Sequence, residues 1–382
     1  MGEIMKTNNK AIIKKSSSRR SFLKKAALAT GATALGVSGL SAPAITAERK
    51  EITMVMTWPE NFPGLGTGAA RFAKRVTEMS SGRLNVTLYP AGKRVGAFDS
   101  FDHVASGKAQ IYHGAEYYWT AKDPAFAFFC TVPFGLTYVE MNAWIRWGGG
   151  QQLWDELAGK YDLKSFMCGN TGVQAGGWFR KEIKSPADFK GLKIRMPGLG
   201  GQMMTKLGAS VVSLPGGQIY ENLVNGNIDA TEWVGPFADE FMKFYEATKI
   251  MYASGVHEPG SMLSVGINKS WFSGLSKGDQ ALIEAAASAE NDIMMAEFAA
   301  KNGDALVRLK KNHGVKVLQY NDRIYDAFGK AANEVYGEVT ANSPMAKKVY
   351  DSFVKARRDI GTYYQASDVT YLQQRNRVLK LS

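Results

Sequence analysis

One arginine lies at the point where an expected strand ends. The stretch GLKIRMPG, residues 191–198, alternates like a strand, and Arg195 precedes the Met-Pro-Gly turn that ends it. A guanidinium buried in a cleft must meet an anion, because burying an unpaired charge is very unfavourable. Its planar fork of donors matches a carboxylate through two hydrogen bonds, whereas lysine offers only a point charge. Arg195 therefore indicates a site for a small acid, with an exposed arginine on an edge strand as the alternative.

Two glutamates occupy comparable positions at expected turns. Glu232, in DATEWVGP, lies at a strand end beside a tryptophan, where its carboxylate would be partly desolvated. Glu258 lies in a similar turn, HEPG. Two carboxylates beside one anionic ligand would repel each other unless a cation lies between them. The pair therefore favours a cation site, and the alternative is that each glutamate pairs with a nearby lysine or arginine.

Other motifs are weaker indicators of chemistry. GLGTGA (64–69) and GLGGQM (198–203) precede expected helices, but neither has the GxGxxG spacing and the later acidic residue of a dinucleotide site. The four histidines are scattered without an HExxH motif, and His257 is interpreted as a solvated turn residue. Cys130 and Cys168 lie in apolar surroundings, so two buried thiols are favoured over a disulfide.

The N-terminus has the pattern of an export signal. A basic region leads to SRRSFLK, residues 18–24, then to an Ala- and Gly-rich apolar stretch and to the small residues of SAPAITA. The paired arginines followed by Phe-Leu-Lys resemble a twin-arginine signal, with cleavage expected near Ala44 or Ala47. A basic surface loop before a buried helix is the alternative. We expect residues 1–47 to be this signal and the mature protein to be periplasmic.

The charge balance depends on that signal. The first 47 residues contain eight Lys or Arg and one Glu, so their removal lowers the net charge from +12 to about +5. No Lys/Arg run follows, which gives no electrostatic case for binding nucleic acid. No later stretch approaches the roughly 20 apolar residues of a membrane helix, so we expect a soluble protein. A mature chain of this length suits two lobes with two cores.

The elements that must position these residues follow an α/β pattern. Three alternating strands separated by helices predict a mostly parallel sheet with right-handed crossovers. Such sheets bind ligands at the carboxyl ends of their strands, and here those ends are rich in Trp and Tyr, among them Trp58 and Tyr118. The three strands are expected at 51–58, 83–90 and 109–118.

A second α/β pattern begins near Phe166, and a long Ala-rich helix is expected from Ser276. The tail is amphipathic, with an apolar stripe that has no obvious home in a two-lobe protein. Its members are Met345, Val349, Phe353, Ile360 and Tyr364. We expect lobe 1 at 48–170 with part of 265–310, lobe 2 at 171–264, and a C-terminal helical region at 311–382.

The stretch from GGWFR to EWVGP, residues 176–236, followed by HEPGSM, residues 257–262, resembles the solute receptors of tripartite ATP-independent periplasmic (TRAP) transporters. It is most similar to the branch that binds 2-oxo and 2-hydroxy monocarboxylates with a metal ion. The resemblance covers essentially the whole mature chain. It implies an α/β, type II-like periplasmic binding protein with two lobes, a hinge and a C-terminal helical extension. It also implies a receptor rather than an enzyme, a membrane permease as partner, and a homodimer held mainly by residues 343–382.

The resemblance also assigns roles to single residues. Arg195 matches the arginine that holds the substrate carboxylate. The substrate-binding residues that it implies are Arg195, Asn170, Gln174, Tyr118 and Trp233, of which Asn170 and Tyr118 match less specific motifs. The metal ligands that it implies are Gln174, Glu232, the backbone carbonyl of Trp233, and Glu258.

This implied ligand set contains only oxygen atoms, which suits a hard cation and not zinc. Two glutamates and a bound acid against Arg195 leave a cluster that calcium would make neutral, so calcium is favoured. Sodium is the alternative, because the resembled transporters run on a sodium gradient. The rival function is an exported oxidoreductase or lyase acting on a small carboxylic acid, since folded export often serves cofactor enzymes.

Overall fold

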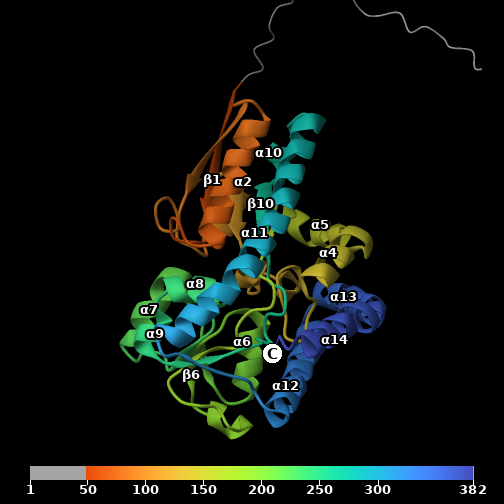
Figure 1. The fold of residues 1–382 in the computed structure, drawn as a ribbon. Coiled ribbons are helices and arrows are strands. Elements are labelled where there is room, and N and C mark those ends of the chain that lie inside the picture. The colour runs from red at the N-terminus through yellow and green to blue at the C-terminus, as the bar shows by residue number, and fades with distance from the viewer. Residues whose placement is uncertain (1–48, 382) are drawn as a thin grey trace, which may run out of the picture. The chain divides into compact units, whose positions relative to one another are not determined.

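The computed structural model describes residues 49–381, and the expected export signal lies outside the described residues. The described chain forms two sheets surrounded by helices (Figure 1). We call the elements built on the first sheet lobe 1 and those built on the second sheet lobe 2. Among the described residues, no helix has the length and apolar character needed to cross a membrane.

Lobe 1 is built on a five-stranded sheet in the order β2–β1–β3–β10–β4. β1 runs parallel to β2 and β3, as the sequence predicts, whereas β10 is antiparallel to both of its neighbours. Its strands are β1 (Lys50–Met56), β2 (Leu84–Tyr89), β3 (Ile111–Gly114), β4 (Leu163–Asn170) and β10 (Met262–Asn268). Its helical elements are α2 (Leu65–Met79), α3 (Ser100–Ala105), η1 (Glu116–Trp119), η2 (Pro124–Phe129), α4 (Tyr138–Trp147), α5 (Gly150–Gly159) and α10 (Lys269–Ser273).

Lobe 2 is built on a six-stranded sheet in the order β11–β9–β5–β8–β6–β7. β6 is parallel to both β7 and β8, and β5 is antiparallel to β8 and β9. Its strands are β5 (Gly177–Phe179), β6 (Lys193–Arg195), β7 (Ser210–Val212), β8 (Ala230–Thr231), β9 (Ile250–Tyr252) and β11 (Lys316–Leu318). Its helices are η3 (Pro186–Phe189), α6 (Gly198–Lys206), α7 (Gly216–Val224), α8 (Pro236–Phe241) and α9 (Phe244–Ala247).

One long helix, α11 (Lys277–Lys311), contacts both lobes (Figure 1). The side chain of Ser276 caps its first turn by accepting a hydrogen bond from the backbone N–H of Asp279, 3.1 Å away. In its middle, the buried carboxylate of Glu290 pairs with Arg71 of α2. Near its end, Arg308 pairs with Glu240 of α8. The helix therefore ties α2 of lobe 1 and α8 of lobe 2 to one rigid element.

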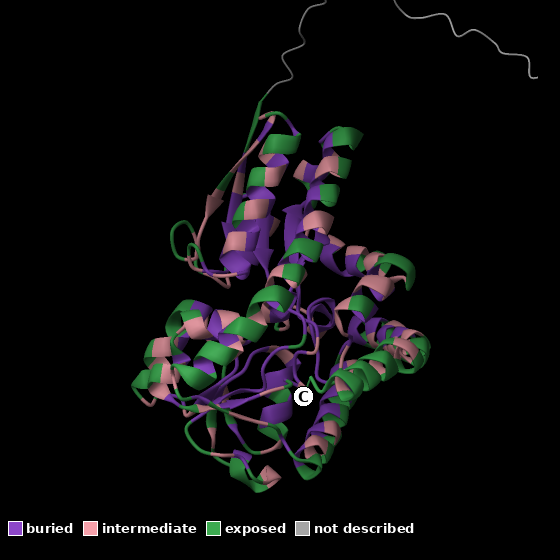
Figure 2. Cartoon of the chain, in the orientation of Figure 1, coloured by how far each residue is buried: buried purple, intermediate pink, exposed green. Residues whose placement is uncertain are grey.

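The tail folds as α12 (Asp322–Asn342), α13 (Pro344–Tyr364), the π-helical segment η4 (Gln365–Val369) and α14 (Thr370–Leu379). The expectation that its apolar stripe has no home on its own chain was wrong for most of α13. Phe353 is buried and packs at a ring-centroid distance of 5.4 Å from Phe128 and 5.1 Å from Trp144. α14, in contrast, has no buried residue (Figure 2). Its apolar side chains are therefore the part of the tail that remains exposed.

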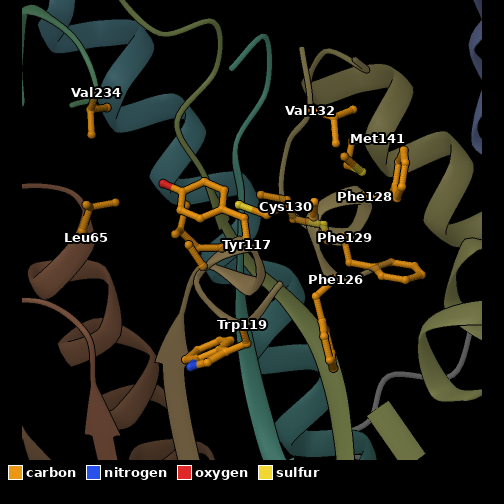
Figure 3. Close-up of a cluster of buried hydrophobic side chains, with 14 of the residues drawn as sticks. Leu65, Tyr117, Trp119, Phe126, Phe128, Phe129, Cys130, Val132, Met141 and Val234 are labelled. Carbon is orange, nitrogen blue, oxygen red and sulfur yellow. The ribbon is translucent and has the colours of Figure 1, made fainter. Parts of the chain in front are cut away.

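An aromatic cluster fills the core of lobe 1 behind the strand ends. Figure 3 shows Phe126, Phe128 and Phe129 of η2 beside Cys130, and all four are fully buried. Cys130 and Cys168 are both buried free thiols, as the sequence predicts. Figure 3 shows Tyr117 beside Cys130 of this cluster, and Tyr117 also lines the small cavity described below.

Candidate functional site

Two neighbouring parallel strands of lobe 2 bring Arg195 and Glu232 together. Arg195 is the last residue of β6, and Glu232 directly follows β8. The register of these strands pairs Arg195 with Thr231, and the backbone N–H of Glu232 donates to the carbonyl of Arg195 over 3.3 Å. Carboxyl ends of parallel strands meet at one edge of a sheet, so this adjacency follows from the topology.

The guanidinium of Arg195 is completely buried. It makes an ion pair, a hydrogen bond and a cation–π contact, all with residues of lobe 2. Its Nη1 forms an ion pair with the carboxylate of Glu232. Its Nε donates to the carbonyl of Leu214 over 3.1 Å, and its face lies 5.1 Å from the ring centre of Trp233. Its Nη2 has no hydrogen-bond partner among residues 49–381. One side of the guanidinium fork is therefore available to an acceptor.

The turn that carries Trp233 is held by Asp239 of α8. Asp239 accepts hydrogen bonds from the backbone N–H groups of Val234 and Gly235, at 3.1 and 3.0 Å. Its other oxygen accepts from the indole N–H of Trp178 at 2.8 Å. Burial raises the pKa of Asp239 to about 7. These contacts fix the backbone of the turn, and with it the position of the Trp233 carbonyl.

Gln174 and Glu258 lie on two segments that run between the lobes. The backbone N–H of Gln174 donates to the carbonyl of Glu258 at 3.1 Å, and the N–H of Gly255 donates to the carbonyl of Gln174 at 2.7 Å. The side-chain amide of Gln174 donates to Thr171 and to Ser261, at 3.1 and 3.2 Å. These donations orient the amide, and its oxygen has no partner in the described chain.

Asn170 joins the same two segments through its side chain. Its Nδ2 donates to the carbonyl of Gly260 over 3.3 Å, and its Oδ1 accepts from the N–H of Gly172 over 2.8 Å. Asn170 is fully buried at the end of β4. Its amide thus holds the backbone between the lobes, which leaves one N–H for any further contact.

A small cavity lies where these elements meet, with a volume of about 10 Å³, close to the least that holds one water molecule. Figure 3 shows Tyr117 with Leu65 and Val234 on its far side from Cys130, and all three residues line this cavity. Other residues of its wall are Trp58, Tyr118, Thr171, Gln174, Trp233 and Ser261. The strand-end aromatics noted in the sequence therefore lie at the site, together with two residues implied by the resemblance.

Glu232, His257 and Glu258 form a buried cluster whose ligand atoms all lie within 4.8 Å of one another. The interpretation of His257 as a solvated turn residue was wrong, because this side chain is only 3% exposed and its Nε2 lies 3.6 Å from the carboxylate of Glu232. The sequence signal that could have placed His257 in this cluster was its position next to Glu258. Thr171 and Ser261 also escaped the sequence analysis, because single hydroxyl residues in polar loops carry no distinctive signal.

Burial raises the pKa of Glu258 well above its usual range, and the nearby Glu232 carboxylate adds to the effect. The hydroxyl of Ser261 donates a hydrogen bond to Glu258 and partly offsets this rise. A buried carboxylate facing another carboxylate requires a proton or a cation between them.

The donor atoms fit a hard metal ion. The unpartnered oxygens of Gln174 and Glu232 are buried at the site, and Glu258 supplies a second carboxylate. Amide, carbonyl and carboxylate oxygens are the ligands that calcium and similar cations prefer. The arrangement therefore places candidate cation ligands beside a guanidinium donor, which is the chemistry needed to hold a small anion between them.

A sequence model of the family described as bacterial extracellular solute-binding protein, family 7, matches residues 54–343. A monocarboxylate 2-oxoacid-binding periplasmic protein of Nostoc sp. is 38% identical over 356 residues, which cover 92% of this chain and 97% of that protein.

Two solved structures are similar over most of the chain. A TRAP transporter solute-binding protein of Bordetella bronchiseptica shares 32% identity with a TM-score of 0.85, covering 87% of this chain and 99% of that one. It is described as a mixed-occupancy dimer with calcium and picolinate in one active site and an apo second site. A TRAP solute-binding protein of Pseudoalteromonas atlantica shares 36% identity with a TM-score of 0.83, covering 85% and 99%, and contains sodium and pyruvate.

Proposed function

This chain belongs to family 7 of the bacterial extracellular solute-binding proteins, and on that premise we propose that it captures a small 2-oxo or 2-hydroxy monocarboxylate together with a metal ion. The acid is of the pyruvate, 2-oxo acid or lactate class, and the receptor delivers it to the membrane permease of a TRAP-type transporter. The observation that carries this proposal is the buried cluster of Arg195, Glu232 and Glu258 beside the oxygen of Gln174.

Arg195 is the proposed anchor for the carboxylate of the acid. Its Nη2 has no partner among the described residues, and its Nε and Nη1 are already held by Leu214 and Glu232. A guanidinium fixed in this way loses little conformational freedom when an acid binds. Tyr118 and Trp233 form the aromatic wall against which the small apolar part of the acid would lie.

The proposed metal ligands are Gln174, Glu232, the Trp233 carbonyl and Glu258, and the bound cation would also hold the 2-oxygen of the acid. Two carboxylates and a bound monocarboxylate give three negative charges against the single positive charge of Arg195. A calcium ion makes this cluster neutral, whereas sodium leaves one uncompensated charge in a buried place. We therefore favour calcium over sodium, although similar receptors have been solved with either ion.

Capture requires the lobes to move apart and close. The cavity has room for about one water molecule, so an acid reaches Arg195 only after the segments around Gln174 and Glu258 act as a hinge. We propose that closure over the acid forms the surface that the permease recognises. We also propose that no reaction is catalysed, so the bound acid is recovered unchanged. The proposed route to the periplasm is the twin-arginine signal at 1–47.

We also propose a homodimer formed through the exposed end of the tail. α14 is exposed along its whole length, and Tyr371, Val378 and Leu379 are each about 60% exposed. Trp147 at the end of α4 is 91% exposed and lines a groove between α4 and α13. A second copy of α14 seated in this groove would cover both apolar surfaces, and one similar receptor has been solved as a dimer.

The decisive experiment is a thermal-shift screen of the mature protein after removal of metals with a strong chelator. Pyruvate, lactate and branched 2-oxo acids are tested with calcium, with sodium and with neither, and acetate and propionate are the controls because they lack the 2-oxygen. An acid at about 100 times its dissociation constant adds about 2.7 kcal/mol of stability, which raises the Tm by about 4 °C. If no 2-oxo or 2-hydroxy acid raises the Tm with either ion, the proposed function is wrong.

A further inference from the structure

The loop between β1 and α2, residues 57–64, is fixed firmly to lobe 1. The indole N–H of Trp58 donates to Nδ1 of His113 over 2.8 Å, and the N–H of Ala91 donates to the carbonyl of Trp58 over 2.9 Å. Burial lowers the pKa of His113 to about 4, so its neutral ring keeps a lone pair for this bond. The carbonyl of Phe62 accepts from the N–H of Thr67 at 3.0 Å and joins the loop to α2.

From this loop, the ring of Phe62 crosses to lobe 2. It lies 5.4 Å from the ring of Trp233 and 5.4 Å from the ring of Phe241, nearly perpendicular to both. Phe62 is 1% exposed, and Phe241 is 56% exposed at the end of α8. Edge-to-face aromatic contacts of this kind are favourable beyond the area that they bury. Phe62 is therefore a rigidly mounted side chain of lobe 1 whose ring packs against lobe 2.

The ring that Phe62 contacts is the one that covers Arg195. The indole of Trp233 lies against Phe62 in one direction and 5.1 Å from the Arg195 guanidinium in another. On the lobe 2 side, a Cβ at Gly216 would lie only 2.4 Å from the indole, so the glycine backbone packs directly on it. With Phe62 in place, the indole is confined between the loop, the α7 backbone and Arg195.

We propose that Phe62 is a positioning residue that holds Trp233 over Arg195 while the lobes are together and thereby controls how fast the acid leaves. This inference rests on the proposed function. Because the Phe62–Trp233 contact forms only between the two lobes, it stabilises the closed receptor and not the encounter of the acid with the open one. Its loss therefore raises the dissociation rate constant and leaves the association rate constant nearly unchanged.

The test is stopped-flow kinetics of pyruvate binding to Phe62→Ala, with calcium present. We expect dissociation about tenfold faster, equivalent to about 1.4 kcal/mol, with association within about threefold of the wild type. Phe241→Ala removes one of the two ring contacts that Phe62 makes with lobe 2, and it should speed dissociation about threefold. Because Phe241 is largely exposed, this variant keeps the test valid if Phe62→Ala fails to fold. The matched control is Phe328→Ala, a buried ring of α12 that packs on Phe189 and should leave both rate constants unchanged.

A distance measurement separates this inference from the proposed function. Spin labels at Lys93→Cys in lobe 1 and Gln218→Cys in lobe 2 report the separation of the lobes, and the two native cysteines are buried. If wild type binds pyruvate and both phenylalanine variants release it at the wild-type rate, the role of Phe62 is refuted. If wild type binds none of the acids, the proposed function is wrong. The role of Phe62 is then tested by the distance between the two spin labels in the ligand-free protein. A longer mean distance in Phe62→Ala then supports its role, and an unchanged distance refutes it.

Discussion

Replacing Arg195 with lysine keeps the positive charge and removes the planar fork. Arg195 uses Nε for the Leu214 carbonyl and Nη1 for the Glu232 carboxylate, and its Nη2 is the donor assigned to the acid. A single ammonium group cannot reach these three directions at once. Lysine is expected to keep the ion pair with Glu232, because that contact compensates a buried carboxylate, and to lose the donor that faces the acid.

The size of the expected affinity loss follows from the ligand carboxylate, which is left without its charged partner. A buried carboxylate of the ligand that loses its charged partner costs about 2 to 4 kcal/mol, which corresponds to roughly 30- to 1,000-fold weaker binding. The folded protein loses the hydrogen bond that the charged guanidinium donates to the Leu214 carbonyl, an interaction of about 1.5 to 3 kcal/mol. The predicted result is therefore a large loss of affinity, with a loss of stability no greater than that of this one hydrogen bond.

The assay is calorimetric titration of pyruvate into Arg195→Lys with calcium, alongside urea unfolding of the ligand-free protein. Arg308→Lys is the matched control, because Arg308 makes a two-pronged contact with the carboxylate of Glu240 at the surface of lobe 2 and is not among the proposed ligand-binding residues. Near-normal affinity in Arg195→Lys would place the arginine outside the acid site. A loss of stability well above about 3 kcal/mol, with near-normal affinity, would show that the guanidinium is structural rather than ligand-binding.

Three further predictions concern the ion, a buried carboxyl and the tail. Chelator-stripped protein should bind pyruvate weakly in sodium and regain affinity with calcium, and Glu258→Gln should lose most of this calcium effect in calorimetry; full binding in sodium alone would identify sodium as the ion. Burial raises the pKa of Glu116 to about 7 from 4.5, so the folded state keeps a proton that the unfolded state releases. Stability should therefore fall as pH rises from about 4.5 to about 7, and Glu116→Gln should remove up to about 3 kcal/mol of that fall in urea unfolding; an unchanged pH dependence would contradict this. Deleting residues 365–382 should convert a dimer into a monomer in light scattering, whereas a full-length monomer at micromolar concentration would refute the dimer.

Adjacent strand ends were the most predictable part of the site. Alternating strands and intervening helices predict parallel pairing, and parallel pairing brings strand carboxyl ends together. Arg195 ends β6 and Glu232 directly follows β8, and these strands are neighbours in the sheet, so their contact follows from local pattern and topology. Trp58, just beyond the end of β1, was predictable for the same reason, whereas Tyr118 lies in η1 because β3 ends at Gly114 and does not extend to residue 118 as expected.

The segments between the lobes were less predictable, because their positions depend on long-range contacts. Gln174 and Glu258 are 84 positions apart, and backbone hydrogen bonds between irregular segments bring them together. No periodicity marks such a pairing, and only the resemblance to known receptors pointed to it. His257 shows the same limit, because a turn sequence such as HEPG says nothing about whether other elements cover it.

The amphipathic tail shows that a correct helix does not determine its partner. The helical spacing of Met345, Val349 and Phe353 was visible in the sequence, and the helix is present as α13. Its apolar face is covered by η2 and α4 of the same chain, whose aromatic residues lie more than 200 positions away. Sequence periodicity specifies the face to be buried, whereas the shape of the remaining core selects what buries it.

With Glu232 and Glu258 in one buried cluster, the proposed binding of the ion and that of the acid depend on the same quantity, the net charge of the cluster. Glu232 is compensated by Arg195, and burial together with the Glu232 carboxylate raises the pKa of Glu258, which favours a proton on it when no cation is bound. An acid that entered alone would add an uncompensated negative charge, and a calcium ion that entered alone would leave an excess of positive charge once Glu258 ionised. In the proposed site, each ligand would therefore remove the electrostatic penalty of the other, and we expect their binding to be coupled in both directions by the same factor. We therefore expect this cluster to retain the acid only together with its ion.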